Sequence, residues 1–253
     1  MTVRRIPAAL AAAALALAAG CGGAADGGDP SSAPTTSVPA PPAPVTGAVA
    51  SPDVVLDAST VARAEGEVAV YDEPGGSEPA SVLPPTTEFG SPRALLVVAD
   101  HGDWLQVSLP VRPNGATGWV RRDGLELRTI DEAIVVDTAA RTLTLLDAGE
   151  PVLTTPVAVG TPDNPTPTGA YFVVDKLDTG DPSGPYGRFA FGLSAHSDTL
   201  TEFAGGDGQV GIHGTDDPSS IGHAVSHGCI RVPADVAQRL SDTVNLGTPV
   251  VVS

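Results

Sequence analysis

The stretch that decides the fold and chemistry of this chain reads Gly211-Ile212-His213-Gly214-Thr215 and, after a short loop, Ser226-His227-Gly228-Cys229-Ile230-Arg231-Val232. It sets a thiol close in sequence to two histidines and surrounds it with glycine. A thiol beside imidazoles suits nucleophilic acyl transfer, because the sulfur attacks as thiolate and an imidazole moves the proton. A neighbouring imidazolium is expected to lower the pKa of the thiol. The pattern therefore predicts a cysteine nucleophile at position 229.

Three other interpretations of Cys229 stay open from the residues alone. It could be a buried structural thiol, since free cysteine is often buried. It could bind zinc together with His213, His223 and His227, although only His223-x₃-His227 has a spacing typical of zinc ligands. It could also form a disulfide with Cys21, the other cysteine of the chain.

The composition favours a β-rich protein that does not bind nucleic acid. Hydrophobic residues make up 42% of the chain and aromatic residues only 4%, while the 29 glycines and 25 prolines favour many turns and short strands over long helices. Lys and Arg number 13 against 30 Asp and Glu, which gives a net charge of −17. Binding to nucleic acid needs a basic face, so this charge argues against such a partner.

The N-terminus has the features of an export signal. Arg4 and Arg5 precede an apolar, alanine-rich stretch over residues 6–19, which is typical of a signal peptide and short for a membrane span. Ala18-Ala19-Gly20-Cys21 resembles a bacterial lipobox. We therefore predict a signal peptide over residues 1–20 and lipidation of Cys21, with an ordinary cleaved signal as the alternative. The mature protein is then anchored to the cell membrane by its lipid and faces the cell wall.

Two folded domains are expected after a tether. Residues 21–52 are rich in Ala, Pro, Gly and Ser and are predicted to be disordered. Residues 54–128 carry short strand signals, among them Gly102-Asp103-Trp104-Leu105-Gln106-Val107 and Thr117-Gly118-Trp119-Val120. This unit resembles a bacterial SH3-like small barrel. Its aromatic residues could recognise a wall or peptide ligand, or they could fill a small core.

Residues 132–253 are expected to form a mostly antiparallel β domain with one short helix after the cysteine. The helix signal is Pro233 near the start, Asp235 in the first turn, and Val236 and Leu240 four residues apart. The fold class is therefore mainly β. The predicted strands cover residues 133–137, 142–146, 152–159, 170–175, 189–193, 210–213 and 250–252.

The second domain resembles the L,D-transpeptidases with a YkuD-type catalytic domain, which cross-link bacterial peptidoglycan. Their signature is His-Gly, a variable loop, and Ser/Thr-His-Gly-Cys followed by an aliphatic residue and Asn or Arg, which is read here as His213-Gly214 and then 226–231. A second family feature appears as Thr166-Pro167-Thr168-Gly169. The resemblance covers residues 132–253 and implies a YkuD-type β-rich fold there.

The resemblance implies a role for each residue of the signature. Cys229 would be the nucleophile, His213 the general base, and the carbonyl of Gly214 would orient the His213 ring. The backbone amides of His227, Gly228 and Cys229 would form an oxyanion hole.

Substrate-binding roles fall on Arg231, Ser226 and Tyr186. Arg231, where many members carry asparagine, would hold a substrate carboxylate, and Tyr186 lies in a segment where the family tends to place a lid. Three histidines have no matching role and are expected to be solvated loop residues: His101, His196 and His223.

The implied reaction is a two-step acyl transfer on peptidoglycan stem peptides, without a metal or organic cofactor. Cys229 attacks the third residue of a tetrapeptide stem and expels D-Ala, and an amine of a second stem then takes the acyl group from the thioester, which makes a 3→3 cross-link. Carbapenems are expected to acylate Cys229, and the chain is expected to act as a monomer. Other interpretations are an L,D-carboxypeptidase, attachment of proteins to the wall by the same site, and a non-catalytic, lipid-anchored wall-binding protein.

Overall fold

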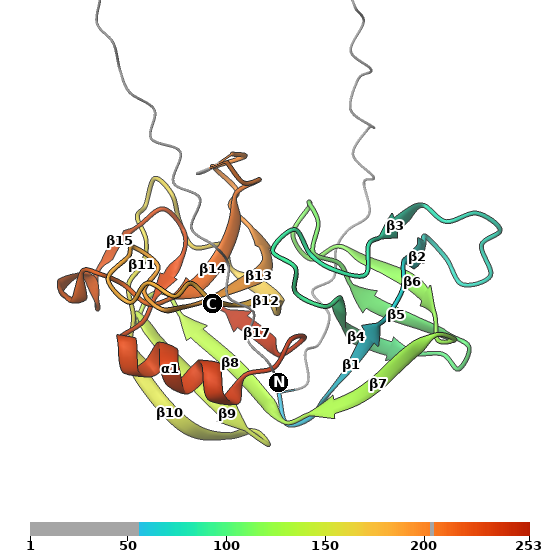
Figure 1. Cartoon of the computed structure of the whole chain (residues 1–253), viewed down its shortest axis with the longest axis horizontal. Helices are drawn as coiled ribbons and strands as arrows, with labels where there is room; N and C mark the ends of the chain where they lie inside the picture. The colour runs from blue at the N-terminus through green and yellow to red at the C-terminus, as the bar shows by residue number, and fades with distance from the viewer. Residues whose placement is uncertain (1–55, 203–204) are drawn as a thin grey trace, which may run out of the picture. The chain divides into compact units, whose positions relative to one another are not determined.

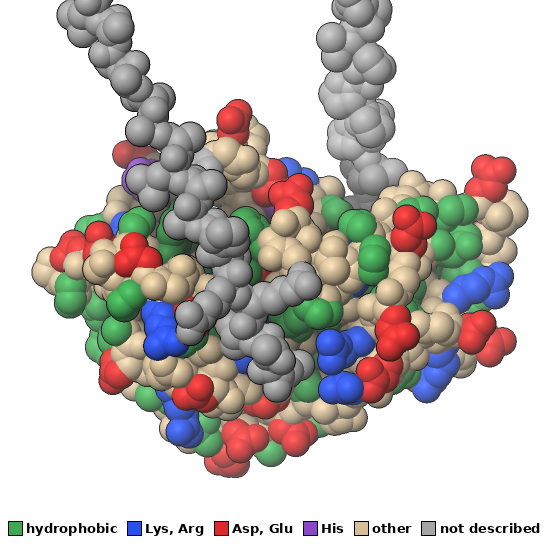
Figure 2. Space-filling model, in the orientation of Figure 1, with side chains coloured by type: hydrophobic (Ala, Val, Ile, Leu, Met, Phe, Trp, Pro, Cys, Tyr) green, Lys and Arg blue, Asp and Glu red, His purple; other side chains and the backbone are tan. Residues whose placement is uncertain are grey.

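Short strands separated by glycine- and proline-rich turns make up the folded part of the chain, as the composition predicts. The computed structural model describes residues 56–202 and 205–253 (Figure 1). The predicted signal peptide, Cys21 and the tether lie outside the described residues. Figure 2 shows acidic side chains spread across the face in view, which agrees with the excess of Asp and Glu in the sequence.

The first part of the described chain is a seven-stranded sheet in the order β3-β2-β6-β5-β4-β1-β7, and all its neighbouring strands are antiparallel. Its core includes Leu95, Leu105 and Val107, which are almost completely buried. The SH3-like barrel stays a prediction for this region. The strands are β1 (Ser59–Ala64), β2 (Val68–Tyr71), β3 (Ser81–Leu83), β4 (Ala94–Asp100), β5 (Trp104–Ser108), β6 (Thr117–Arg121) and β7 (Leu125–Ile130).

The second part is an eight-stranded sheet in the order β10-β9-β8-β17-β12-β13-β14-β16. It is mostly antiparallel, with parallel pairs only between β8 and β17 and between β14 and β16. A further parallel pair, β11 with β15, lies outside this sheet. The strands are β8 (Glu132–Asp137), β9 (Thr142–Asp147), β10 (Glu150–Pro156), β11 (Val159–Gly160), β12 (Gly169–Asp178), β13 (Phe189–His196), β14 (Gln209–His213), β15 (Ala224–Ser226), β16 (Ile230–Arg231) and β17 (Pro249–Val252).

Strand β12 is buried on both of its faces. Because side chains alternate along a strand, Tyr171 and Val173 belong to the core of the second sheet, whereas Phe172 and Val174 join the core of the first. The described residues of both sheets fall within one compact unit. The long apolar run in β12 therefore serves two cores at once.

The helix predicted after the cysteine is confirmed. Helix α1 (Ala234–Thr243) follows Pro233, carries Asp235 in its first turn and buries Val236, Ala237 and Leu240. In the described part of the chain a single-turn 3₁₀ helix, η1 (Pro218–Ser220), is the other helical element. Neither helix has the length and apolar character that a membrane crossing requires.

The strand predicted over residues 152–159 is wrong as a single element. Strand β10 ends at Pro156, and the chain then leaves this edge of the sheet. Ala158 forms a β-bridge with Arg231, and Val159 pairs with Ala224. The residues after Pro156 therefore pair with the segments on either side of Cys229 and do not continue β10.

Replacing Phe172 tests the double burial of β12. Phe172 is fully buried, so Phe172→Ala is expected to lower the free energy of unfolding by about 3–5 kcal/mol, and Phe172→Leu by less. Chemical denaturation measures both. Val152→Ala is the control, because Val152 is 46% exposed. A loss below about 1 kcal/mol for Phe172→Ala would contradict burial between the two cores.

Candidate active site

The parallel pairing of β14 and β16 brings the thiol and the imidazole together. Ile212 lies opposite Ile230 and His213 opposite Arg231, so the same register places Gly211 opposite Cys229. The Cys229 thiol hydrogen-bonds with the backbone of Gly211, which agrees with this register. Because side chains alternate along strands, His213, Arg231 and Cys229 project from the same face. Sequence reasoning missed Gly211, although the Gly-x-His spacing in β14 was the available signal.

The His213 ring is held in one tautomer. It is only 5% exposed, and its Nδ1 lies 2.5 Å from the carbonyl oxygen of Gly214. A carbonyl only accepts hydrogen bonds, so Nδ1 carries the proton and Nε2 keeps its lone pair. This hydrogen bond is the contact that the resemblance implies for Gly214, and it leaves Nε2 as the basic nitrogen.

Tyr186 lies over the His213 ring. The two ring centroids are 4.9 Å apart with an interplanar angle of 67°, and Tyr186 remains 42% exposed. The next residue, Gly187, has φ +59°, and a Cβ there would stand 2.9 Å from the Cα of Gly214. Only glycine therefore allows this segment to lie directly on the backbone whose carbonyl holds His213. Sequence reasoning placed Tyr186 near the site but missed Gly187.

Burial keeps the resting pair neutral. The pKa of His213 is lowered to about 4, mainly by burial and further by the charge of Arg231, while the hydrogen bond to Gly214 opposes this shift. Burial raises the pKa of the Cys229 thiol, and the hydrogen bond to Gly211 and the charge of Arg231 lower it only in part. Burial thus acts against the lowering of the thiol pKa that an imidazolium was expected to produce. At neutral pH the site holds a thiol and a neutral imidazole.

Ser226 closes the loop that carries Cys229. Its hydroxyl donates to the carbonyl oxygen of Cys229 at 2.5 Å and accepts from the Gly228 amide at 3.1 Å. The residue is 2% exposed. A buried hydroxyl with both partners inside the loop does not face a ligand, so the predicted substrate-binding role of Ser226 is corrected to a positioning role.

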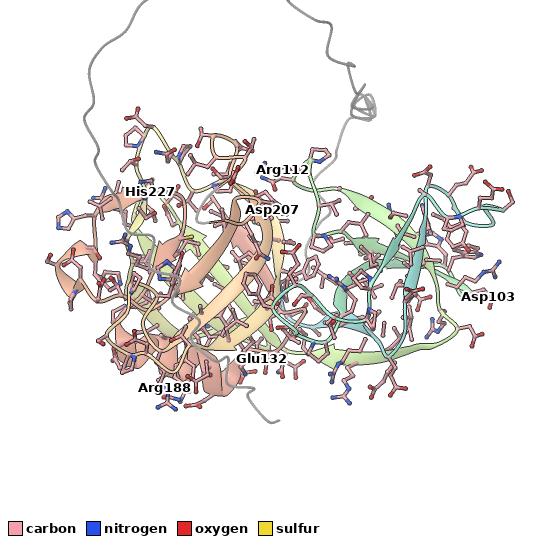
Figure 3. The ribbon with its side chains drawn as sticks, turned by 45° about the horizontal axis from the view of Figure 1, so that its top comes forward. Asp103, Arg112, Glu132, Arg188, Asp207 and His227 are labelled. Carbon is pink, nitrogen blue, oxygen red and sulfur yellow. The ribbon has the colours of Figure 1, made fainter. Side chains whose placement is uncertain are left out.

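The same hydrogen bond changes the predicted oxyanion hole. The Gly228 amide is engaged by Ser226, so it can serve in the predicted oxyanion hole only if this hydrogen bond breaks. Gly228 itself has φ +117°, a conformation that favours glycine. The side chain of His227 is exposed (Figure 3).

The interpretation of Cys229 as a zinc ligand receives no geometric support. Over residues 56–202 and 205–253, the structure places no three His, Cys, Asp or Glu side chains so that they could share a metal ion. Cys229 is a free, partly exposed thiol. His223 and His101 are exposed, as expected. His196 is not, because it is 4% exposed and its Nε2 lies 3.0 Å from Asp207 Oδ2.

Arg231 has a side chain that is incompletely satisfied. Its Nε is buried and, among the described residues, has no hydrogen-bond partner. Arg231 lies opposite His213 and its charge acts on both His213 and Cys229. A guanidinium in this position can receive a carboxylate close to the thiol.

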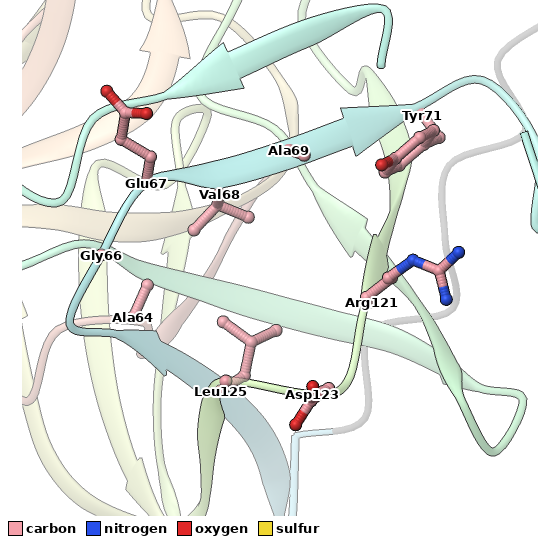
Figure 4. A pocket seen from close by; sticks show the side chains of 10 residues that line it. Ala64, Gly66, Glu67, Val68, Ala69, Tyr71, Arg121, Asp123 and Leu125 are labelled. Carbon is pink, nitrogen blue, oxygen red and sulfur yellow. The ribbon is translucent and has the colours of Figure 1, made fainter. Parts of the chain in front are cut away.

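A separate hollow of about 420 Å³ lies in the first sheet (Figure 4). Tyr71 and Arg121 are part of its lining. Trp104 packs between them, 5.1 Å from the Tyr71 ring centroid and 4.7 Å from the Arg121 guanidinium carbon. None of the residues of the Cys229 site lines this hollow. Ligand binding by the first domain stays a prediction.

Comparisons with known proteins match the C-terminal half of the chain. A family profile for the L,D-transpeptidase catalytic domain, YkuD, matches residues 131–252. YkuD of Bacillus subtilis (strain 168) is 36% identical over 125 residues, which are 49% of this chain and 68% of that protein. A mutant L,D-transpeptidase of Enterococcus faecium is similar in structure, with 27% identity and a TM-score of 0.38, over 49% of this chain and half (50%) of that one. The LD transpeptidase LdtMt1 in complex with imipenem has 20% identity and a TM-score of 0.40, over 59% of this chain and 90% of that one.

The pH dependence of alkylation tests the neutral pair. Because the pKa of Cys229 is raised, the thiolate fraction at pH 7 is smaller than in a free thiol, and iodoacetamide should react more slowly than with a model thiol. The alkylation rate should keep rising as the pH increases past the ordinary pKa of a thiol, because the pKa of Cys229 is higher. Peptide mass spectrometry follows Cys229 separately from Cys21. A fast rate that is already constant between pH 6 and 7 would show a thiolate–imidazolium pair instead.

Replacing Ser226 tests its positioning role. Ser226→Ala leaves a buried carbonyl and a buried amide without their partner, so a loss of about 1–3 kcal/mol in the free energy of unfolding is expected. The altered loop should also change the alkylation rate of Cys229. Ser219→Ala is the matched control, because Ser219 bonds through its hydroxyl to Asp217 on an exposed turn. Equal stability and equal alkylation rates in both variants would contradict the role of Ser226.

Proposed function

The chain belongs to the family of L,D-transpeptidases with a YkuD-type catalytic domain, and on this premise we propose that it forms 3→3 cross-links in peptidoglycan through a thioester on Cys229. The observation that carries the proposal is the convergence of three groups on one face: the Cys229 thiol, the His213 ring with a basic Nε2, and Arg231. Together they supply a nucleophile, its base and a binding point for an anionic peptide.

In the first half-reaction, the Cys229 sulfur attacks the carbonyl of the third stem residue while His213 Nε2 takes the thiol proton. The peptide C–N bond then breaks, and His213 returns the proton to the leaving D-Ala amine. The product is a thioester of the tripeptide stem. The neutral resting pair suits this sequence, because the proton transfer happens only when a carbonyl is in place to be attacked.

In the second half-reaction, the side-chain amine of another stem attacks the thioester carbonyl. His213 takes a proton from this amine and gives it to the departing Cys229 sulfur, so both groups return to their initial state. The amide bond that forms joins two third residues. His213 keeps the required tautomer throughout, because the Gly214 carbonyl fixes the proton on Nδ1.

Arg231 and Tyr186 are proposed to hold the stem. The unpartnered Nε of Arg231 points to a carboxylate of the donor peptide as its natural ligand. Tyr186 is partly exposed and contacts the His213 ring edge-on. Its ring can cover the thioester and limit the access of water.

The proposed location follows from the N-terminal sequence. Export by the signal over residues 1–20 and a lipid on Cys21 would hold the catalytic domain near the wall, where stem peptides occur. The predicted tether over residues 21–52 would set its reach. The acceptor in the second half-reaction remains the main alternative, because water would give a carboxypeptidase and a protein amine would give wall attachment.

Mass spectrometry of reaction products tests the proposed function. The full-length chain, purified in detergent, is incubated with a disaccharide-tetrapeptide. The expected product is a dimer that is lighter than two substrates by one D-Ala. Cys229→Ala should abolish this product, since no thioester can form. An excess of imipenem should add its own mass to Cys229.

His223→Ala is the matched control, because His223 is exposed and belongs to none of the proposed site groups. It should retain full activity. A tripeptide without dimer, again dependent on Cys229, would change the function to a carboxypeptidase. If folded wild-type protein gives neither product nor acyl-enzyme, the enzyme hypothesis fails for this substrate and a wall-binding role gains weight.

A further inference from the structure

Two residues that follow β5 bind backbone groups of the catalytic domain between β13 and β14. We infer that Arg112 and Asn114, in the connection between β5 and β6, are positioning residues that hold one side of the proposed substrate site. Their target is the neck of the β13–β14 loop, defined as residues 197–200 and 207–208. The effect on catalysis rests on the proposed function, whereas the positioning itself can be measured independently.

The side-chain amide of Asn114 binds the backbone of His196, where the neck begins, through one donor and one acceptor, as the backbone of a neighbouring strand would. Its Nδ2 donates to the His196 carbonyl oxygen at 2.7 Å, and its Oδ1 accepts from the His196 amide at 2.8 Å. Both hydrogen-bonding groups of one backbone residue are thus satisfied by one side chain. This pair fixes the end of β13, where the neck begins.

Arg112 joins the two sides of the neck. Its guanidinium donates to the carbonyl oxygens of Ser197 at 2.7 Å, Asp207 at 2.9 Å and Leu200 at 3.2 Å. Figure 3 shows Arg112 and Asp207 beside one another. Three converging carbonyl dipoles repel each other unless a cation lies between them, and a planar guanidinium can serve all three.

The neck itself is shaped to admit this guanidinium. Gly208 has φ +82°, and a Cβ there would stand 2.1 Å from the Leu200 carbonyl oxygen and 3.0 Å from the guanidinium of Arg112. Only glycine leaves room for this arrangement. The Ser197 amide also donates to the Gly208 carbonyl at 2.9 Å, directly across the neck.

A short chain of contacts leads from the neck to the nucleophile's loop. Thr199 Oγ1 donates to Asn164 Oδ1 at 3.1 Å. The residue after Asn164 is Pro165, whose carbonyl oxygen lies 3.5 Å from the position of a Cβ on Gly228. The amide of Thr161 donates to the Ser226 carbonyl at 3.0 Å. Residues 161–168, which include the first three residues of the Thr-Pro-Thr-Gly feature, therefore lie between the neck and the loop of Cys229.

This arrangement gives the proposed substrate site two flanking segments, here called its walls, from different sources. Tyr186 stands on the side of His213, and residues 161–168 with the neck stand on the side of Gly228. The first wall belongs to the catalytic sheet alone, while the second is held by Arg112 and Asn114 from the first sheet. Loss of these contacts should leave the thiol and its base in place but let the second wall move.

Kinetics of Arg112→Ala test the inference. The KM for the disaccharide-tetrapeptide should rise about tenfold or more, because small displacements of a binding wall weaken the alignment of substrate strongly. The rate of iodoacetamide alkylation at Cys229 should stay unchanged, because this small reagent needs only the thiol. A general loosening of the fold would speed alkylation as well. Arg112→Lys should recover part of the KM, because an ammonium can still donate to the neck carbonyls.

Arg122→Ala is the matched control. Arg122 lies in the turn between β6 and β7, pairs with Asp100 at 2.7 Å on the surface, and its loss makes the same change in charge. It should leave KM unchanged. Asn114→Asp keeps the size of the side chain and an acceptor for the His196 amide but loses the donor to the His196 carbonyl. Its KM should therefore also rise. Equal KM values for Arg112→Ala and Arg122→Ala would overturn the inference.

Amide hydrogen exchange separates this inference from the proposed function. In Arg112→Ala and Asn114→Asp, the amides of His196, Ser197 and Thr161 should exchange faster than in wild type. The amides of β17 should not change, which shows that the variants are folded. Lack of activity of the wild-type protein on the stem peptide would overturn the proposed function alone. Unchanged exchange at these three amides in the variants would overturn the positioning role.

Discussion

In the catalytic sheet, β16 contributes only two residues to its pairing with β14, yet this short parallel pair sets Arg231 beside His213 and Cys229 beside Gly211. Neighbouring segments hold it from several directions. Ala158 exchanges both backbone hydrogen bonds with Arg231, and the Val232 amide donates to the His213 carbonyl at 2.9 Å. A parallel pair cannot be joined by a tight turn, so a longer loop connects β14 and β16 and needs hydrogen bonds of its own to stay ordered. The buried hydroxyl of Ser226 supplies one of them, because it donates to the carbonyl oxygen of Cys229.

The site combines a neutral thiol and a neutral imidazole, and the imidazole is held in one tautomer. Burial disfavours charge on both the thiol and the imidazole, so the pKa of Cys229 is raised and that of His213 falls to about 4. What prepares the pair for chemistry is therefore geometry, above all the hydrogen bond between His213 Nδ1 and Gly214. The packing of Gly187 on Gly214 ties this hydrogen bond to the position of Tyr186. The base and the aromatic cover of the site are thus held by a single backbone contact.

Much of the candidate site could be predicted from the sequence, since its residues occur in two short motifs. Thiol chemistry predicts Cys229 and a nearby histidine from the residues themselves, whereas the roles of His213 and Gly214 come from the resemblance to the family signature. The role of Ser226 was predicted wrongly, because a motif does not show whether a hydroxyl faces the ligand or the backbone. His196 was expected in solvent, yet it is buried at the end of β13. Its side chain lies 3.0 Å from Asp207, and its backbone is held by Asn114, which is remote in sequence and carries no motif.

The sequence by itself determined the mainly β composition and the short helix after Pro233, and it supplied the motif on which the proposed nucleophile and base rest, because alternation, turn residues and motif chemistry are local properties of the chain. Only the tertiary structure decided the protonation state of the pair, the double burial of β12 and the contact of Arg112 with the neck of the β13–β14 loop. These depend on desolvation and on contacts between segments far apart in sequence. Such contacts follow from how the strands pack, and no local pattern of residues encodes them.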